Sequence, residues 1–203
     1  MARIKTRQKI LDEAANMFSE KGYSTVSVRD IANACFIKES TLYYHFENKR
    51  DILNTIIKEF ETRQKEITDT IEDAISPSIL LKAKPVSFDW IYDTYCEQFL
   101  FDPFCNKVMR ILLLEQFNDI KIQAQYNECF FERTYKLNKV SMMVLEKSRS
   151  RKKTDDSEII QLFNSFLISL IFKYLMNGPL TDQNKIQFKK ELDSYCEKFH
   201  KNN

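Results

Sequence analysis

The chain has 203 residues, of which 43% are hydrophobic, and its formal net charge is only +2. This length allows one small domain and one of ordinary size, each with a filled core. No apolar run approaches the roughly 20 residues that span a bilayer, and the charged start lacks the apolar segment of a secretion signal. We therefore expect a soluble globular protein of the cytoplasm, without a membrane partner.

The sequence lacks the common motifs of catalysis and metal binding. Its two glycines, Gly22 and Gly178, are too far apart to build a P-loop or a dinucleotide fingerprint. Its two histidines, His45 and His200, form neither a metal-binding pair nor a catalytic triad. The five cysteines contain no Cys-x-x-Cys pair, which favours reduced, mostly buried thiols. We expect no enzyme, no metal and no cofactor.

The first predicted helix runs from about Thr6 to Glu20, and Gly22 follows at the position of a left-handed helix cap. Four basic residues precede the first acid at Asp12, and more basic residues recur over 38–50. The positive field therefore lies near the N-terminus, as in a nucleic-acid-binding surface.

A predicted helix-turn-helix follows. Ser27 is a good N-cap, with Asp30 as its capping-box partner, ahead of a short apolar stripe. In the second helix Leu42 and Phe46 are four residues apart on one face, whereas residues 43–45 point elsewhere. The first helix is expected to support the second, which would read DNA.

The order of residues from Thr6 to Leu53 resembles the N-terminal DNA-binding domain of the TetR/AcrR family of bacterial transcriptional regulators. The resemblance covers Arg7–Ala15 with Phe18, then Glu20–Tyr23, then the helix-turn-helix, roughly the first quarter of the chain. It implies that Phe18, Ile31, Leu42 and Phe46 hold a three-helix core.

The same resemblance implies which residues contact DNA. The start of the reading helix and its aromatic pair would face the major groove, where lysine can reach guanine or phosphate and glutamate can accept from cytosine. Other side chains would bind phosphates, one of them in the first turn of the next helix. The implied DNA-binding residues are Ser27, Lys38, Glu39, Ser40, Thr41, Tyr43, Tyr44, His45 and Lys49.

Two positions depart from the family pattern. Phe36 stands where a glycine is common, so a bulky residue occupies a turn that is often left-handed. Lys38-Glu39 stands where Ser-Lys is common, which removes a preferred N-cap and replaces a basic residue by an acidic one. The operator sequence can therefore not be inherited from a relative.

Asn48, with Asp51 as its capping partner, opens a long predicted helix whose apolar stripe continues to Pro77. At 1.5 Å per residue it would be a rod about 40 Å long that joins two domains without a flexible linker. We expect a helix-turn-helix domain over 1–47 and a helical effector-binding and dimerisation domain over 48–203.

The four prolines fall between periodic apolar segments, and no alternating strand pattern occurs. A basic run over 147–153 is expected to be a solvated loop. The fold class is therefore all-α. The further predicted helices are Phe88–Phe101, Phe104–Phe117, Ile120–Lys147, Asp155–Asn177 and Asp182–Phe199.

The helix from Asp155 is apolar almost all round, so both of its sides should be buried. A second copy of the chain would cover one side, and TetR-like proteins pair through C-terminal helices into a four-helix bundle. Ordinary packing within one subunit is the alternative. The predicted homodimer interface comprises Phe172, Leu175, Phe188, Leu192 and Tyr195.

Aromatic residues are dense between residues 88 and 172, the region that encloses a ligand pocket in the family. Such a pocket would suit a hydrophobic or amphipathic molecule, oriented by Glu115, Gln116 or Gln123. An aromatic stripe can equally be core. The predicted effector pocket comprises Trp90, Tyr95, Phe99, Phe117, Tyr126, Phe130, Phe163 and Phe166.

These features predict a homodimeric repressor that binds a palindromic double-stranded DNA operator and is released by a small hydrophobic effector. One alternative is a redox-responsive regulator acting through Cys35, which an exposed thiol of low pKa would support. Another, suggested by Phe36 and Glu39, is a protein-interaction adaptor that no longer reads DNA.

Overall fold

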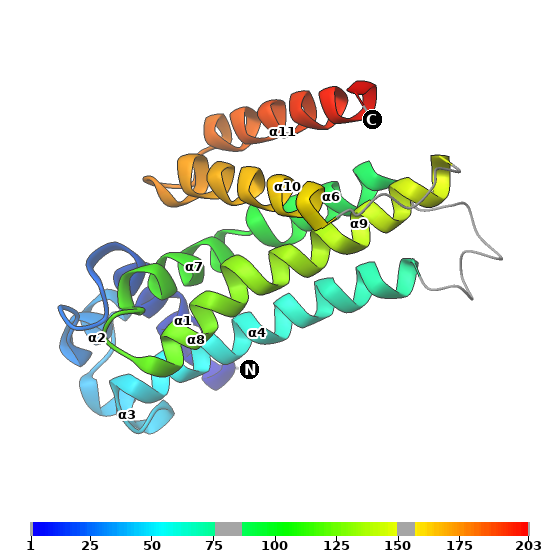
Figure 1. Cartoon of the computed structure of the whole chain (residues 1–203). Coiled ribbons are helices and arrows are strands. Elements are labelled where there is room, and N and C mark those ends of the chain that lie inside the picture. The colour runs from blue at the N-terminus through cyan, green and yellow to red at the C-terminus, as the bar shows by residue number, and fades with distance from the viewer. Residues whose placement is uncertain (1, 76–86, 150–156, 203) are drawn as a thin grey trace. The chain divides into compact units, whose positions relative to one another are not determined.

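A computed structural model describes residues 2–75, 87–149 and 157–202, and over these ranges the chain is helical, with no strand (Figure 1). Pro77, Pro85 and most of the predicted basic loop, residues 150–153, lie outside the described residues. None of the described helices combines the length and apolar character needed to cross a membrane. The predicted all-α fold class is confirmed.

The chain divides into two compact units. Unit 1 comprises residues 1–65 and 103–126, and unit 2 comprises residues 66–102 and 127–203. The long helix α4 (Lys49–Ala74) begins in unit 1, and its residues from Glu66 onward belong to unit 2. The predicted boundary after residue 47 separates functions, whereas these units are defined by the contacts within the fold. That boundary therefore stays a prediction.

Unit 1 surrounds the predicted helix-turn-helix. It contains α1 (Ala2–Lys21), α2 (Val28–Cys35), α3 (Glu39–His45), the start of α4, α7 (Pro103–Glu115) and most of α8 (Ile120–Asn127). Helix α1 packs against both α2 and α7. As predicted, the core side chains are fully or almost fully buried, namely Phe18, Ile31, Leu42 and Phe46.

Unit 2 is a bundle in which α9 (Arg133–Arg149) packs against α6 (Phe88–Tyr95) and α10 (Ser157–Leu170). Helix α11 (Asp182–Asn202) packs on α10 and on residues Ile171–Met176, which follow α10 directly. Phe99, Phe130 and Phe163 are fully buried in this bundle. Large aromatic side chains therefore form much of its core.

Three of the predicted helices continue into π-helical segments, which the sequence did not predict. These segments are η1 (Cys96–Leu100) after α6, η2 (Glu128–Glu132) between α8 and α9, and η3 (Ile171–Met176) after α10. A π-helix hydrogen-bonds from residue i to i+5, and such segments often occur at functional sites. All three segments lie in unit 2.

The structure places three of the predicted interface residues in the core of unit 2. Leu175 and Phe188 are fully buried and Leu192 almost fully, within the single chain. Buried side chains offer no surface to a second copy, so packing within one subunit describes these three positions. Phe172 and Tyr195 are only half-buried.

All five cysteines are free and buried, as predicted. Burial raises the pKa of Cys35 above its ordinary value, with Glu13 adding to the rise and Lys9 opposing it. The redox alternative required an exposed thiol of low pKa, and Cys35 has neither property.

Candidate nucleic-acid interface

The supporting helix α2 begins with the predicted capping box. The Asp30 N–H donates to Ser27 Oγ at 3.1 Å, and the Ser27 N–H donates to Asp30 Oδ2 at 2.8 Å. Ser27 Oγ also donates to Asp30 Oδ2 at 2.6 Å. Both donors of Ser27 are therefore used by Asp30, and these hydrogen bonds lower the pKa of Asp30. As placed, Ser27 caps the helix and has no donor left for a phosphate.

The turn between α2 and α3 keeps a left-handed residue although it lacks glycine. Phe36 has φ +58° and ψ +40°, and its ring is 89% exposed. Its N–H donates to Asn33 O, and the Ile37 N–H donates to Ala32 O, each at 3.0 Å. Two backbone hydrogen bonds thus close α2 around a residue type that disfavours this conformation.

The reading helix α3 is short and is anchored by its apolar side. Leu42 is fully buried and Phe46, which follows the helix, is 2% exposed. Lys38 is the N-cap without a side-chain hydrogen bond to the helix, as the sequence indicated. Because a seven-residue helix is not stable alone, these anchors hold α3 in place.

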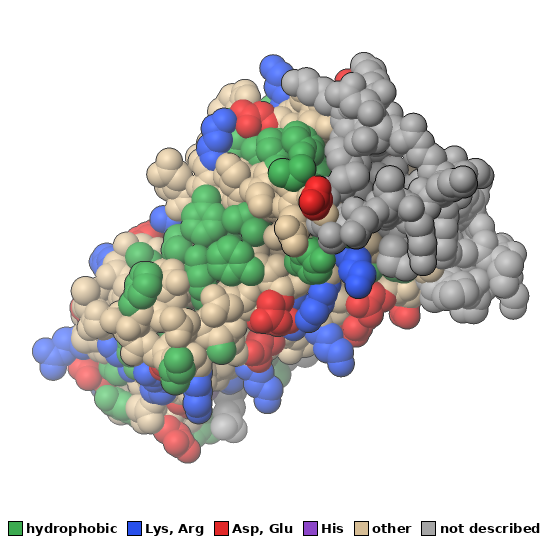
Figure 2. Space-filling model, viewed as in Figure 1, with side chains coloured by type: hydrophobic (Ala, Val, Ile, Leu, Met, Phe, Trp, Pro, Cys, Tyr) green, Lys and Arg blue, Asp and Glu red, His purple; other side chains and the backbone are tan. Residues whose placement is uncertain are grey.

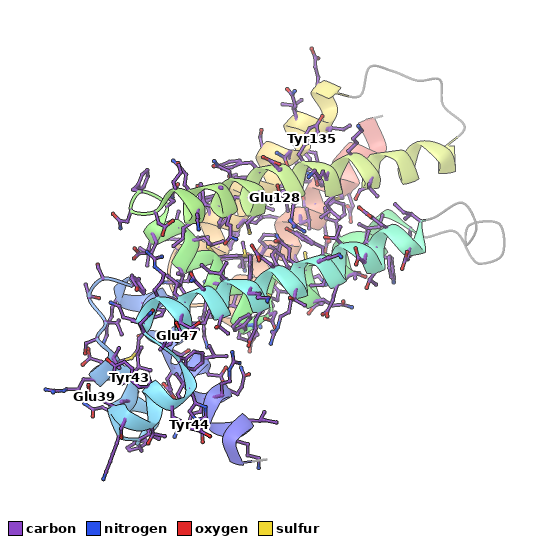
Figure 3. The ribbon with its side chains drawn as sticks, turned by 90° about the horizontal axis from the view of Figure 1, so that it is seen from below. Glu39, Tyr43, Tyr44, Glu47, Glu128 and Tyr135 are labelled. Atoms are coloured by element: carbon purple, nitrogen blue, oxygen red, sulfur yellow. The ribbon has the colours of Figure 1, made fainter. Side chains whose placement is uncertain are left out.

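The opposite side of α3 presents polar and aromatic groups to solvent. Figure 3 shows Glu39, Tyr43 and Tyr44 along this helix, with Glu47 just beyond it. Tyr43 is 51% exposed and Tyr44 is 64% exposed. Lys38 and Ser40 are also exposed, whereas Thr41 and His45 are half-buried. Seven of the nine implied DNA-binding residues therefore lie together on α3 and its N-cap.

Glu39 is paired within the protein. Its Oε1 accepts a hydrogen bond from Arg29 Nε at 3.0 Å, and both side chains are largely exposed. The pair raises the pKa of Arg29 and partly balances the negative charge that Glu39 would bring to DNA. The acid also suits the positive end of the α3 dipole.

Lys49 has a role that the sequence did not reveal. Its Nζ donates to Tyr23 O at 2.8 Å and to Val26 O at 2.7 Å, and it lies 4.1 Å from the centre of the Tyr23 ring. Desolvation lowers the pKa of Lys49, while the charge of Glu115 opposes the fall. One ammonium hydrogen remains for a phosphate, so the predicted DNA contact stays a prediction.

On the face seen in Figure 2, basic and acidic side chains are interspersed over unit 1. Arg7 is 3.7 Å from Glu59, and Arg50 is 2.8 Å from Asp119. Lys9 donates to Cys35 O at 3.0 Å. Several of the basic residues that suggested a positive surface therefore also fix helices to one another.

The predicted effector-pocket residues belong to both units and differ in exposure. Tyr95, Phe99, Phe130 and Phe163 are buried in unit 2. Phe117 belongs to unit 1 and is 85% exposed. Trp90 and Phe166 in unit 2 are partly exposed, and Tyr126 belongs to unit 1.

Sequence reasoning missed a row of buried polar side chains on α9. Thr134, Asn138 and Ser141 are fully buried and recur at helical spacing on one face. Asn138 Oδ1 accepts from Tyr92 Oη at 2.6 Å, and Asn138 Nδ2 donates to Asn164 Oδ1 at 2.9 Å. The recurrence of a polar residue at every third or fourth position could have indicated this buried row. The aromatic residues nearby drew the prediction towards an apolar pocket instead.

Comparison with known proteins concentrates on the N-terminal segment. Residues 10–56 match the family model for bacterial regulatory proteins of the tetR family. Over 80 residues the chain is 35% identical to the HTH-type transcriptional repressor DhaR of Mycobacterium sp. (strain GP1). The aligned segment covers 39% of this chain and 40% of DhaR. Over 52 residues it is 44% identical to IcaR, the HTH-type negative transcriptional regulator of the biofilm operon icaADBC in Staphylococcus aureus (strain Newman), covering 26% of this chain and 28% of IcaR.

The matches thus span less than half the length of these curated relatives, both of which are transcriptional regulators. The likeness of fold extends further. A protein from Saccharomonospora viridis, described as a transcriptional regulator and solved in complex with choline, aligns with a TM-score of 0.60 at 20% identity. That alignment covers 93% of this chain and 96% of the other. Residues 10–56 are thus similar to the DNA-binding segment of the tetR family, and the fold over most of the chain is shared with the Saccharomonospora viridis protein.

Proposed function

We propose that the protein is a ligand-responsive transcriptional repressor that binds a palindromic operator as a homodimer. The observation that carries this proposal is the exposed face of α3, where Ser40, Tyr43 and Tyr44 stand on a helix anchored by buried Leu42 and Phe46. This face lies within the matched segment, and two relatives that share the segment are repressors.

Each half-site would receive one α3 in its major groove. Lys38 would reach guanine or a phosphate, and Tyr43 and His45 would bind phosphates, which position the helix on the duplex. Two copies related by a two-fold axis would place their α3 helices in successive major grooves. The adaptor alternative has less support, because Phe36 is accommodated in a closed turn and Glu39 is paired with Arg29.

The effector would bind in unit 2, around the buried polar row of α9. Apolar pockets orient a ligand with a few polar groups, and Asn138, Tyr92 and Thr134 are such groups within an aromatic core. The ligand would have an apolar body and one hydrogen-bonding group. Since α4 belongs to both units, a shift of its far end would change the spacing of the two reading helices.

A second copy would bind on α10 and α11. On α10, Leu162 is 65% exposed, and on α11, Ile186 is 59% exposed. The rings of Phe166 and Tyr195 stack at 3.9 Å between the two helices and line a groove of about 420 Å³. A second copy bound on these two helices would bury these apolar side chains.

The first test is fluorescence anisotropy with the upstream intergenic DNA of the gene itself, compared with a scrambled duplex of equal composition. The native protein should bind the upstream DNA at least 100-fold more tightly, and binding should weaken as salt increases. The Tyr43→Ala variant should lose roughly tenfold or more in affinity with unchanged thermal stability. Tyr135→Ala, at a half-exposed tyrosine of unit 2 (Figure 3), is the matched control and should bind like the native protein.

Equal, weak binding to both duplexes and to duplexes recovered by unbiased site selection would contradict DNA reading. Once selective binding is established, the same anisotropy signal screens candidate effectors, because a true effector releases the labelled operator. An amphipathic molecule that releases the native protein should fail to release Asn138→Leu, in which the central polar group of α9 is lost.

A further inference from the structure

Tyr23 contacts two helices of unit 1, α7 and α4, through hydrogen bonds of its backbone. It lies in the loop between α1 and α2, and its N–H donates to Glu115 Oε1 at 2.8 Å. Its carbonyl accepts from Lys49 Nζ at 2.8 Å. The Tyr23 ring also packs edge to face on Phe18 at 5.2 Å and lies 5.1 Å from the Arg50 guanidinium. Side chains of α7 and α4 therefore hold both backbone polar groups of Tyr23, its N–H and its C=O.

Glu115, the last residue of α7, is a buried acid, 5% exposed. Besides the Tyr23 N–H, its carboxylate accepts from Asn118 Nδ2 at 3.2 Å. Gly22 leaves room for this approach, because a Cβ at Gly22 would lie 3.2 Å from Glu115 Oε1. Gly22 also has φ +80°, so its lack of a side chain serves both the turn and the contact.

Asp119 makes a second contact between the segment after α7 and the rest of unit 1. Asp119 caps α8 by accepting from the N–H groups of Lys121 at 2.8 Å and Ile122 at 3.3 Å. The same carboxylate pairs with Arg50 at 2.8 Å. The turn between α7 and α8 is thus attached to the α1–α2 loop through Glu115 and to the first turn of α4 through Asp119.

We propose that Glu115 is a positioning residue for DNA binding, acting through the loop that precedes the helix-turn-helix, α2 and α3. This inference rests on the proposed function. Lys49 holds the loop at Tyr23 and Val26, and Ser27, which caps α2, comes next. Without the Glu115 carboxylate, the Tyr23 N–H loses its acceptor in a part-buried site and the loop is no longer held between α7 and α4.

Helix α7 does not depend on Glu115 for its place in unit 1. It contributes the buried side chains Val108, Met109, Ile111 and Leu112, and it packs on α1. Loss of the carboxylate therefore releases the loop and leaves the fold intact. Because Glu115 of α7 bonds to Tyr23 in the loop before α2, a shift of α7 would be passed to the helix-turn-helix through this hydrogen bond.

Three variants test the proposal by affinity for operator and for scrambled DNA. Glu115→Ala should lose roughly tenfold in operator affinity, while its affinity for scrambled DNA stays equal or rises because a negative charge near Lys49 and Arg50 is lost. Glu115→Gln keeps a carbonyl acceptor for the Tyr23 N–H and should remain within about threefold of the native protein. Gln116→Ala, directly after α7, is the matched control: its side-chain amide donates to Leu113 O of α7, and the variant should bind operator like the native protein.

Native operator affinity in Glu115→Ala would overturn the proposal, as would an equal loss in Glu115→Gln, which would indicate charge instead of the hydrogen bond. Amide hydrogen exchange tests, without DNA, whether the hydrogen bond from Tyr23 to Glu115 holds the loop. Exchange from Tyr23 to Ile31 should be faster in Glu115→Ala than in the native chain or Glu115→Gln, and unchanged protection would overturn the proposal. If the native chain reads no DNA, the proposed function fails. The exchange experiment still tests whether Glu115 restrains the loop.

Discussion

At the scale of single residues, Phe36 combines two unfavourable features, a left-handed backbone and a ring that is 89% exposed. An ordinary L-residue in this conformation costs about 1 kcal/mol, and asparagine tolerates it better. The ring lies 5.1 Å from Lys9 Nζ, measured from its centre. An exposed contact of this kind contributes only about 0.5 kcal/mol.

We therefore expect Phe36→Asn to stabilise the protein by about 0.5 kcal/mol, which should raise the midpoint of thermal unfolding by roughly 2 °C. Calorimetry or circular dichroism measures the midpoint. Phe117→Asn is the matched control, because Phe117 is 85% exposed and its φ is negative. A lower midpoint in Phe36→Asn than in the control would show that the ring contributes more than the turn costs.

At the scale of secondary-structure elements, α2 depends on the exchange of hydrogen bonds between Ser27 and Asp30. Hydrogen bonds from the Ser27 hydroxyl and N–H lower the pKa of Asp30 below its usual value. A carboxyl whose pKa is lowered by folding stabilises the protein above its unfolded pKa, about 3.9 for aspartate. This contribution is lost as the pH falls through the lower pKa of the folded state.

Thermal unfolding between pH 7 and pH 2 should therefore show an acid-dependent loss of stability that is smaller in Asp30→Asn. At neutral pH, Asp30→Asn should unfold at a lower temperature than the native protein, and the two curves should converge once the pH falls below the lowered pKa of Asp30 in the folded state. Asp69→Asn, at an exposed position of α4, is the control and should follow the native curve. Parallel curves for native protein and Asp30→Asn would refute the role given to this carboxylate.

Local signals of capping and periodicity made most elements predictable. The sequence placed the Ser27 cap, the left-handed Gly22 and the buried side of α3 correctly, because neighbouring residues determine each of them. At the start of α4, Asn48 accepts from the Asp51 N–H as expected, but the Asp51 carboxylate accepts from the Glu47 N–H instead of closing the box. The predicted cap was thus half correct.

Features that depend on distant partners were not predictable. A lysine that bonds to carbonyl groups has the same sequence signature as one that binds a phosphate, so Lys49 looked like a DNA contact. Glu115 looked like an orienting group for a ligand, yet its partner is Tyr23, which is remote in sequence. The π-helical segments were not predicted, because a shift from i+4 to i+5 hydrogen bonding leaves the apolar pattern of the sequence almost unchanged.

At the scale of the whole molecule, the homodimer is the next property to test. Leu162→Asp places a charge on the exposed side of α10, where the second copy would bind. Burying an unpaired carboxylate costs several kcal/mol, so this variant should be a monomer at concentrations where the native protein is a dimer. Light scattering coupled to gel filtration measures the mass.

The control for this experiment is Leu114→Asp, at a leucine of α7 in unit 1 that is 46% exposed. It should keep the native mass. If Leu114→Asp dissociates and Leu162→Asp does not, the second copy binds elsewhere than on α10 and α11. Because a palindromic operator needs two reading helices, the monomeric variant should also lose most of its operator affinity.

The construction of α3 separates what keeps the helix folded from what it shows to DNA. Leu42 and Phe46 are buried, while residues such as Ser40 and Tyr44 face solvent, where substitutions usually change stability by less than about 0.5 kcal/mol. Related chains can therefore diverge in their target sequences by surface substitutions alone. A designer could likewise transplant the exposed positions of another reading helix onto this scaffold and retarget the regulator without rebuilding its core.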